Sequence, residues 1–425
     1  MDWKGRPSAP GHAEESLEEL AELAASAGAV VAGQMMQSRA APEAATLIGQ
    51  GKVLELAQLG QSMDADVVIF DHDLTPTQQR NLEKQLARKV IDRTQLILDI
   101  FARRARTREG RLQVELAQLN YRLPRLSGRG IEMSRLGGGI GTRGPGETQL
   151  ETDRRRIHRR IKRIEEDLES VRAGRALHRR QRHAVPLATI ALVGYTNAGK
   201  STLFNRITES GVLADARMFA TLDPTVRQLT LPSRRRVLVS DTVGFIRNLP
   251  TTLVKAFRAT LEEVTEATLI LHVVDLSAPH ASMQAEHVLK VLAEIDAAAI
   301  PQLLVLNKVD RLPEADTDVE AARRRLLGDS DAPEPGARPT RAVAISALNG
   351  RGVAQLLSAI DEVLPFDQIV RVRLRLPLSE GARISQVHDQ GRVLETRYVE
   401  GSCEMDVEIP ESLRRSLAPY LTGSA

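Results

Sequence analysis

The chain is poor in two residue types that often build cores and sites. It has a single cysteine, Cys403, and only 3% aromatic residues among its 425. One cysteine excludes a disulfide framework and argues against a metal site built on thiolates. Because aromatic side chains are so few, Leu, Val, Ile and Ala must fill the cores, and platforms that stack single-stranded nucleic acid are disfavoured.

Long apolar segments are also missing. The longest runs, such as residues 268–274, have the length of a strand, whereas a membrane span needs about 20 residues. The first residues are polar and charged, without the apolar region of a signal peptide. We therefore expect a soluble, cytoplasmic protein with no membrane span. No residue pattern indicates an oligomer, so a monomer is expected.

The most informative motif that is present is a glycine-rich loop at residues 194–201. Its sequence, GYTNAGKS, fits the pattern G-x-x-x-x-G-K-[ST] and follows an apolar run at 189–193. In such a loop, backbone N–H groups surround phosphate oxygens, and the next helix adds a favourable dipole. Lys200 would reach the β and γ phosphates, and the Ser201 hydroxyl would ligate Mg²⁺.

Four further motifs indicate that the nucleotide is GTP. Asp241 at the end of an apolar run would hold the Mg²⁺ shell, and the Gly244 N–H could approach the γ-phosphate. Asp310, in Asn-Lys-Val-Asp at 307–310, could accept two N–H bonds from guanine, which adenine cannot offer. Ser-Ala-Leu at 346–348 could offer a backbone N–H to the guanine carbonyl, and Thr221 could reach Mg²⁺ and the γ-phosphate.

Each motif alone could be an ordinary turn or strand end, but their number and order argue against chance. We therefore predict a GTP-binding domain over residues 184–365. The predicted catalytic residues are Lys200, Thr221 and Gly244, and the predicted Mg²⁺ ligands are Ser201, Thr221 and Asp241. The predicted GTP-binding residues are Gly194, Tyr195, Thr196, Asn197, Ala198, Gly199, Lys200, Ser201, Thr202, Phe219, Ala220, Thr221, Leu222, Asp241, Thr242, Val243, Gly244, Asn307, Lys308, Asp310, Ser346, Ala347 and Leu348.

The motifs leave one mechanistic role unfilled. Many GTPases carry a water-orienting Gln after D-x-x-G, but Phe245 stands here and cannot hydrogen-bond a water. We predict slow intrinsic hydrolysis that a partner accelerates by ordering the mobile segments. Asn197 either holds K⁺ beside the phosphates or only suits the turn geometry of the loop, and both interpretations stay open. His272 is expected to be a hydrogen-bonded strand residue rather than a catalytic one.

Two smaller regions precede this domain. Residues 1–16 look like a disordered tail, and residues 17–95 alternate strand and helix signals that predict a small α/β domain. Strands are expected at 29–31 and 66–70, and helices at 54–59 and 76–86, the second of these capped by Thr75 with Pro76 at its first position.

Residues 96–183 are predicted to form a basic antiparallel helical hairpin. Leucines at 112, 116, 119 and 123, and apolar residues at 157, 161, 164, 168 and 171, form two stripes around a glycine-rich loop at 127–148. Thr148 and Glu151 resemble a capping box that opens the second helix. Although an arginine-rich helix is often only a solvated face, this density favours a surface for phosphate backbones. The candidate RNA-binding residues are Arg129, Arg135, Arg143, Arg154, Arg155, Arg159 and Arg160.

Behind the GTP-binding domain, residues 366–425 are predicted to form a small α+β domain with strands at 369–376, 393–399 and 405–409. Residues 328–340, rich in Asp, Pro and Gly, are expected to be a surface insertion. The predicted fold class is therefore α/β: a P-loop GTPase domain with a mostly parallel sheet, preceded by a small α/β domain with a helical hairpin and followed by a small α+β domain.

From about residue 28 to its end, the chain resembles the bacterial HflX family of ribosome-associated GTPases. The resemblance rests on residues 48–53, the glycine-rich run 137–151 followed by a basic helix, and the segments 194–202, 219–225, 241–245 and 307–310. It implies binding to the large ribosomal subunit and its rRNA, splitting of stalled or idle ribosomes, and a role under heat stress. It also implies that the glycine-rich loop contacts rRNA near the peptidyl-transferase centre. The family's association with ATP hydrolysis has no independent support here, because no second P-loop is present.

Three functions are therefore compared. The first is a GTP-switched factor that binds and splits ribosomes. The second is a GTPase that assists subunit assembly or modifies RNA, although no second catalytic cluster is visible. The third is a signalling GTPase with protein partners only, against which the arginine-dense hairpin argues.

Overall fold

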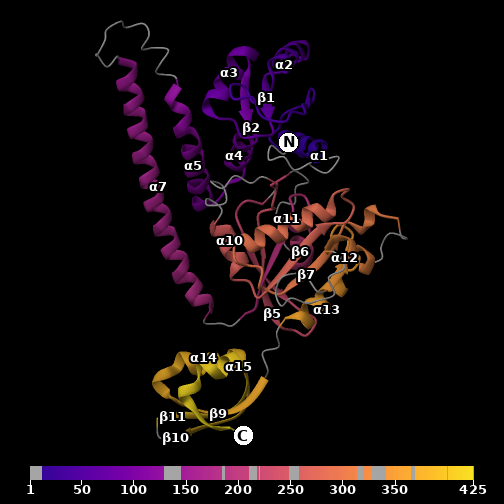
Figure 1. The fold of residues 1–425 in the computed structure, drawn as a ribbon. Coiled ribbons are helices and arrows are strands. Elements are labelled where there is room, and N and C mark those ends of the chain that lie inside the picture. Colours follow the sequence, from indigo (N-terminus) through magenta and orange to yellow (C-terminus); the bar gives the residue numbers. More distant parts are fainter. Residues whose placement is uncertain are drawn as a thin grey trace.

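The computed structural model describes residues 12–128, 145–183, 187–209, 218–219, 221–247, 258–313, 319–327, 341–364, 369–399 and 401–424. These residues form three separate sheets with their helices, and a long helical hairpin that projects beside them (Figure 1). None of the helices in these ranges is long and apolar enough to cross a membrane.

The central domain is built on a six-stranded sheet of order β4-β5-β3-β6-β7-β8. Its strands are β3 (Thr189–Gly194), β4 (Thr225–Thr230), β5 (Arg236–Asp241), β6 (Leu269–Asp275), β7 (Gln302–Asn307) and β8 (Arg341–Ala344). Every neighbouring pair is parallel except the antiparallel edge pair β4–β5. The inner strands are apolar on both faces because helices cover both. The predicted mostly parallel sheet is confirmed.

The helices of this domain follow the strands. α8 (Lys200–Thr208) and α13 (Val353–Val363) pack on one face of the sheet. α10 (Arg258–Thr265), α11 (Ala281–Glu294) and α12 (Val319–Leu327) pack on the other. A short 3-10 helix, η2 (Val309–Arg311), follows β7.

The N-terminal unit contains a parallel pair, β1 (Val67–Phe70) and β2 (Lys89–Asp92), surrounded by four helices. The helices are α1 (His12–Ser26), α2 (Gln50–Ser62), α3 (Pro76–Leu86) and α4 (Arg93–Arg104). Thr75 caps α3 in a capping box with Gln78, and Pro76 occupies its first turn, as predicted. The predicted helix at 54–59 lies within α2, and β1 confirms the strand predicted at 66–70.

Three sequence-based predictions in this unit are wrong, two boundaries and one strand. α1 begins at His12, so residues 12–16 are helical rather than part of a disordered tail, whereas residues 1–11 lie outside the described range. The strand predicted at 29–31 is absent: Val30 is 94% exposed, and among the described residues β1 pairs only with β2. β-Branched residues favour a strand only where a neighbouring edge is available to pair. α4 crosses the expected boundary at 95/96 because Ile97 and Phe101 are buried in the N-terminal core.

The hairpin consists of α5 (Arg108–Arg122), η1 (Leu123–Gly128) and the much longer α7 (Pro145–His183). α5 and α7 lie side by side (Figure 1), and Ile164 and Leu168 of α7 are buried. The predicted hairpin is confirmed, but the predicted cap is not. α7 begins at Pro145, a residue suited to a first helical turn, so Thr148 lies inside the helix. Arg129, Arg135 and Arg143 lie outside the described residues.

The C-terminal unit is an antiparallel sheet of order β10-β11-β9-β12. Its strands are β9 (Ile369–Pro377), β10 (Arg392–Val399), β11 (Ser402–Pro410) and β12 (Leu421–Ser424), and its helices are η4 (Leu378–Glu380), α14 (Gly381–Gln390), α15 (Glu411–Ser416) and η5 (Ala418–Tyr420). The order of elements is the split β-α-β-β-α-β pattern. The three predicted strands are confirmed, and β12 was missed. Cys403 is buried in this sheet.

Candidate nucleotide-binding site

The five predicted nucleotide motifs meet at the carboxyl edge of the central sheet. They line a cavity of about 330 Å³. Ligands of open parallel sheets bind at this edge, where loops from several strands converge. The predicted residues in its lining are Thr196, Asn197, Gly199, Lys200, Ser201, Thr202, Phe219, Thr221, Thr242, Gly244, Asn307, Lys308, Asp310, Ala347 and Leu348.

The glycine-rich loop joins β3 to α8, as its sequence predicts. Gly199 precedes the helix in the left-handed region, with φ of 92°. A Cβ on Gly199 would lie 2.2 Å from the side-chain nitrogen of Asn307, so only glycine fits there. Asn197 also has a positive φ, 62°, and its side chain is exposed. Both residues therefore place the loop in the left-handed region, where glycine and asparagine are the favoured residues.

Lys200 is buried at the base of the cavity. Its Nζ donates hydrogen bonds to the backbone oxygens of Gly194 and Tyr195, at 3.1 and 2.7 Å. Burial lowers the pKa of Lys200 to about 8, although the nearby Asp241 carboxylate opposes this shift. A phosphate chain would favour the charged ammonium in the same way.

The three predicted Mg²⁺ ligands lie together. The Ser201 and Thr221 hydroxyls lie 2.8 Å apart, and they donate to one Asp241 carboxylate oxygen at 2.7 and 2.8 Å. The other Asp241 oxygen is buried without a hydrogen-bond partner among the described residues. Burial raises the pKa of Asp241, while the hydrogen bonds from Ser201 and the charge of Lys200 act against it. Hard oxygen donors with one unpaired carboxylate oxygen suit Mg²⁺, which would neutralise charge on phosphate oxygens.

The guanine-recognition motifs lie on the opposite side of the cavity. The Asn307 side chain donates to the Ala198 oxygen at 2.8 Å and accepts from the Ala347 N–H at 3.0 Å. It therefore ties the glycine-rich loop to the Ser-Ala-Leu loop. The Ala347 N–H, one of the Ser-Ala-Leu amides considered for the guanine carbonyl, is therefore bound to Asn307. Lys308 pairs with Asp275 at 2.7 Å, and Asp310 is exposed on η2.

Gly244 and Phe245 lie directly against the glycine-rich loop. The Phe245 N–H donates to the Gly194 oxygen at 3.0 Å, and the Thr196 N–H donates to the Phe245 oxygen at 2.8 Å. A Cβ on Gly244 would lie 2.8 Å from the Thr196 Cα, so glycine is required. The Phe245 side chain is buried in an apolar cluster of the sheet, so it offers no group to a water molecule.

His272 differs from expectation. It is fully buried on β6, but neither ring nitrogen has a hydrogen-bond partner among the described residues. Burial lowers its pKa to about 4, so the ring is neutral at physiological pH. It is not among the residues that line the cavity. The expectation of a hydrogen-bonded strand histidine is therefore only half right.

The remaining described residues of the prediction are buried next to the cavity and do not line it. Leu222 and Val243 are buried in a cluster shared with the N-terminal unit. Ser346 is buried, and its backbone N–H donates to the Arg351 oxygen at 2.9 Å. Ala220 lies outside the described residues.

Sequence reasoning missed how closely the N-terminal unit contacts this site. The Tyr195 hydroxyl donates to Glu19 of α1 and accepts from the Arg247 N–H at 3.0 Å. The rings of Phe219 and Phe101 meet edge to face, with centroids 4.6 Å apart. No local pattern could show these contacts, because the partners are distant in sequence.

A buried arginine completes this interface. Arg93 is 2% exposed and pairs with Glu19 and Asp71, each at 2.7 Å. It also donates to the backbone oxygen of Arg247, which follows the Gly244 motif, at 3.3 Å. Burial alone would lower the pKa of Arg93, but the attraction of the Glu19 and Asp71 carboxylates is larger and raises it. The ion pairs of Arg93 lie within the N-terminal unit, and its hydrogen bond to Arg247 joins that unit to the segment after Gly244.

The four described RNA-binding candidates lie on α7. Arg154, Arg155, Arg159 and Arg160 are all exposed. Arg155 pairs with Glu151 at 2.7 Å, and Arg160 pairs with Glu115 of α5 at 2.7 Å.

Comparison with known proteins agrees with this architecture. Residues 14–102 match a family model described as GTP-binding GTPase N-terminal, residues 104–182 match its middle region, and residues 189–308 match a model described as 50S ribosome-binding GTPase. GTPase HflX of Caldanaerobacter subterraneus is 45% identical over 96% of this chain and 90% of that protein. GTPase HflX of Escherichia coli is 45% identical over 93% of this chain and 90% of that protein.

A third relative, GTPase HflX of Alkalihalophilus pseudofirmus, is 57% identical over 70% of each chain. The two relatives at 45% identity cover nearly the whole chain, and the family models match the N-terminal unit, the hairpin and most of the GTP-binding domain. The chain therefore belongs to the HflX family of GTPases, enzymes that hydrolyse GTP to GDP and phosphate.

Proposed function

We propose that this GTPase acts in the cytoplasm, where it binds the large ribosomal subunit and its rRNA and splits or rescues stalled or idle ribosomes when GTP is bound. One observation carries the proposal: the arginine-rich helix α7 precedes the GTP-binding domain in the chain, and its side chains of Arg154, Arg155, Arg156, Arg159 and Arg160 are exposed. The family model that matches the GTP-binding domain is described as ribosome-binding, which supports the same partner.

The charge on α7 is accessible to a partner. The side chains of Arg155 and Arg156 are 70% and 72% exposed, even though each pairs with an acidic residue of the same helix. Exposed pairs of this kind contribute little to stability, so exchanging them for phosphate contacts is inexpensive. Binding through such contacts weakens steeply with salt.

The proposed hydrolysis relies on Lys200, Thr221 and Gly244 to place the γ-phosphate. Position 245 holds no group that could orient the attacking water. We therefore propose that turnover is slow in the free protein and that the ribosome stimulates it by fixing the segments around Thr221 and Gly244.

Mg²⁺ is the proposed cofactor, held by Ser201, Thr221 and Asp241. A K⁺ ion beside the phosphates is a further proposal, because Asn197 is exposed at the rim of the cavity. Its left-handed φ of 62° equally fits an asparagine chosen for turn geometry. Hydrolysis rates in K⁺ and Na⁺ buffers distinguish these two roles, and equal rates would eliminate the ion.

Co-sedimentation with ribosomes tests the whole proposal. The GTP-analogue form should bind the large subunit and convert intact ribosomes to subunits on a sucrose gradient, and the GDP form should not. Replacing Arg154, Arg155 and Arg159 with Ala should weaken binding and its salt dependence. The matched control replaces Arg392 and Arg397, exposed arginines of the C-terminal sheet, and should change neither.

Other outcomes would redirect the proposal. Large-subunit binding without splitting would favour a role in subunit assembly. No binding in either nucleotide state would remove the ribosome as partner and leave a GTPase whose hairpin contacts something else.

A further inference from the structure

We propose that Asp223 couples the nucleotide site to the helical hairpin. Asp223 lies in the same segment as Thr221, and its carboxylate binds the start of α5. One Asp223 carboxylate oxygen accepts from the backbone N–H groups of Arg106 and Thr107, at 2.8 and 2.9 Å. The other accepts from the Thr107 hydroxyl. The Thr107 hydroxyl in turn accepts from the Gly110 N–H at 2.9 Å, which makes Thr107 the N-cap of α5. Asp223 therefore binds the residue that caps the helix.

The carboxylate packs directly on the helix backbone. A Cβ at Gly110 would lie 2.3 Å from an Asp223 oxygen, so any larger residue there would push the carboxylate away. A negative charge at this end of a helix is favourable, and hydrogen bonds to a carboxylate are stronger than neutral ones. Gly110, which otherwise weakens a helix, is explained by this close approach.

Thr221 lies only two residues before Asp223. Two residues of chain span at most about 7 Å, so Thr221 cannot leave Ser201 and Asp241 by a large distance without moving Asp223. In GTPases, segments of this kind are ordered by the γ-phosphate and Mg²⁺ and released after hydrolysis. Occupancy of the Thr221 site should therefore decide whether Asp223 remains at the start of α5.

The N-terminal unit also holds the chain just before Thr221. The Met218 N–H donates to the Ser26 hydroxyl of α1 at 3.0 Å, and Phe219 packs on Phe101 of α4. Contacts on both sides of Thr221 therefore connect it to the part of the molecule that carries the hairpin. Asp223 differs from the other two residues because its partner is the hairpin helix itself.

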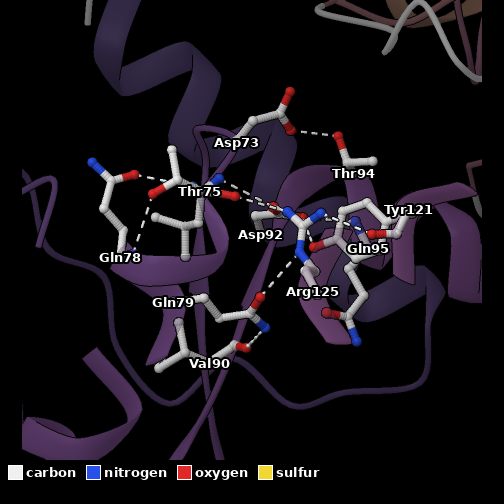
Figure 2. A network of polar contacts seen from close by, with 11 residues as sticks. Asp73, Thr75, Gln78, Gln79, Val90, Asp92, Thr94, Gln95, Tyr121 and Arg125 are labelled. Carbon is white, nitrogen blue, oxygen red and sulfur yellow. Dashed lines mark hydrogen bonds and ion pairs between the residues drawn. The ribbon is translucent and has the colours of Figure 1, made fainter. Parts of the chain in front are cut away.

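The far end of α5 is fixed as firmly as its start. Asp92, fully buried at the end of β2, accepts from the Tyr121 hydroxyl at 2.8 Å and from Arg125 at 3.0 Å (Figure 2). Arg125 also donates to the Gln79 side chain at 3.1 Å and stacks 3.5 Å above the Tyr121 ring. α5 therefore links the Thr221 segment to η1 over a length of about 22 Å. A change at Asp223 should therefore act directly on the first helix of the hairpin.

Nucleotide affinities test this coupling in the full-length protein without ribosomes. Binding couplings are reciprocal, so losing the contact should weaken only the nucleotide that orders Thr221. Asp223→Ala should raise the Kd for a non-hydrolysable GTP analogue about tenfold, the scale of a lost charge-assisted hydrogen bond. Its Kd for GDP should stay within about twofold. Equal shifts for both nucleotides would overturn the proposal.

Hydrogen exchange gives an independent measurement at the helix itself. In the unaltered protein, the peptide containing residues 106–110 should exchange more slowly with the GTP analogue than with GDP. Asp223→Ala should abolish that difference, and its persistence would contradict the coupling. Glu115→Ala is the matched control, because it removes a carboxylate of the same helix that pairs with Arg160. Should Asp223→Ala not fold, Thr107→Ala should produce the same selective change at smaller size, with Thr107→Ser restoring it.

Discussion

The N-terminal and C-terminal units meet the nucleotide-binding domain in different ways. One buried cluster contains Leu23 and Ile97 of the N-terminal unit together with Tyr195, Phe219 and Ile246 of the GTP-binding domain. The C-terminal core, in the part of the chain that the structure describes, consists only of residues of its own unit. The N-terminal unit therefore shares a core with the nucleotide site, whereas the C-terminal unit has a core of its own. A change in the first should alter nucleotide binding, and a change in the second should not.

The largest effect is expected from Arg93→Ala. Removing the guanidinium leaves Glu19 and Asp71 without their buried partner, and breaking a buried ion pair in this way costs about 3–5 kcal/mol. Urea unfolding should show this loss, and affinity for a GTP analogue should fall as well, because Arg93 also contacts the Arg247 backbone. If nucleotide affinity stays unchanged while stability falls, the shared core does not transmit changes in the N-terminal unit to the nucleotide site.

The matched change in the other unit is Leu374→Ala. Leu374 is fully buried in the C-terminal sheet, and such a truncation costs about 2–5 kcal/mol. The C-terminal unit should then unfold at a lower urea concentration than in the unaltered protein. Hydrogen exchange of β9 and β11 measures this unfolding. GTP hydrolysis and nucleotide affinity should equal those of the unaltered protein. A clear drop in either would show that the C-terminal unit communicates with the nucleotide site although it has a core of its own.

The same contrast explains what could be predicted from sequence. Ser201, Thr221, Asp241 and the Thr75 cap could be predicted because each lies in a short motif whose local chemistry is recognisable. Tyr195–Glu19 and Asp223–Thr107 join residues more than a hundred positions apart, and nothing in their local sequence identifies the partner. The strand expected at 29–31 failed for a related reason, since a strand exists only where another edge accepts its hydrogen bonds.

A smaller effect is expected from Tyr195→Phe. The ring and its packing remain, but the Arg247 N–H loses its acceptor and Glu19 loses a donor. An unsatisfied buried group costs about 1–3 kcal/mol. We expect a modest loss of stability. Affinity for the GTP analogue should fall more than affinity for GDP, as measured with fluorescent nucleotides. An unchanged ratio of the two affinities would mean that this hydroxyl serves stability alone.

The smallest effect at neutral pH is expected from His272→Leu, which tests the GTP-binding sheet apart from either neighbouring unit. Both ring nitrogens are buried and unpartnered within the described ranges, so an apolar side chain should be tolerated or should stabilise by about 1 kcal/mol. Burial lowers the pKa of His272 from 6.5 to about 4, whereas in the unfolded chain it returns to its usual value. Between these values the unfolded state binds a proton that the folded state does not, so acidification destabilises the protein.

This loss should begin as the pH falls through about 6.5 and should end near 4, where both states are protonated, with a total on the order of 3 kcal/mol. His272→Leu removes the titrating group, so the difference between the two proteins should widen toward low pH. Urea unfolding at several pH values measures that difference directly. A gap that does not vary with pH would mean that the folded protein protonates His272 as readily as the unfolded chain does.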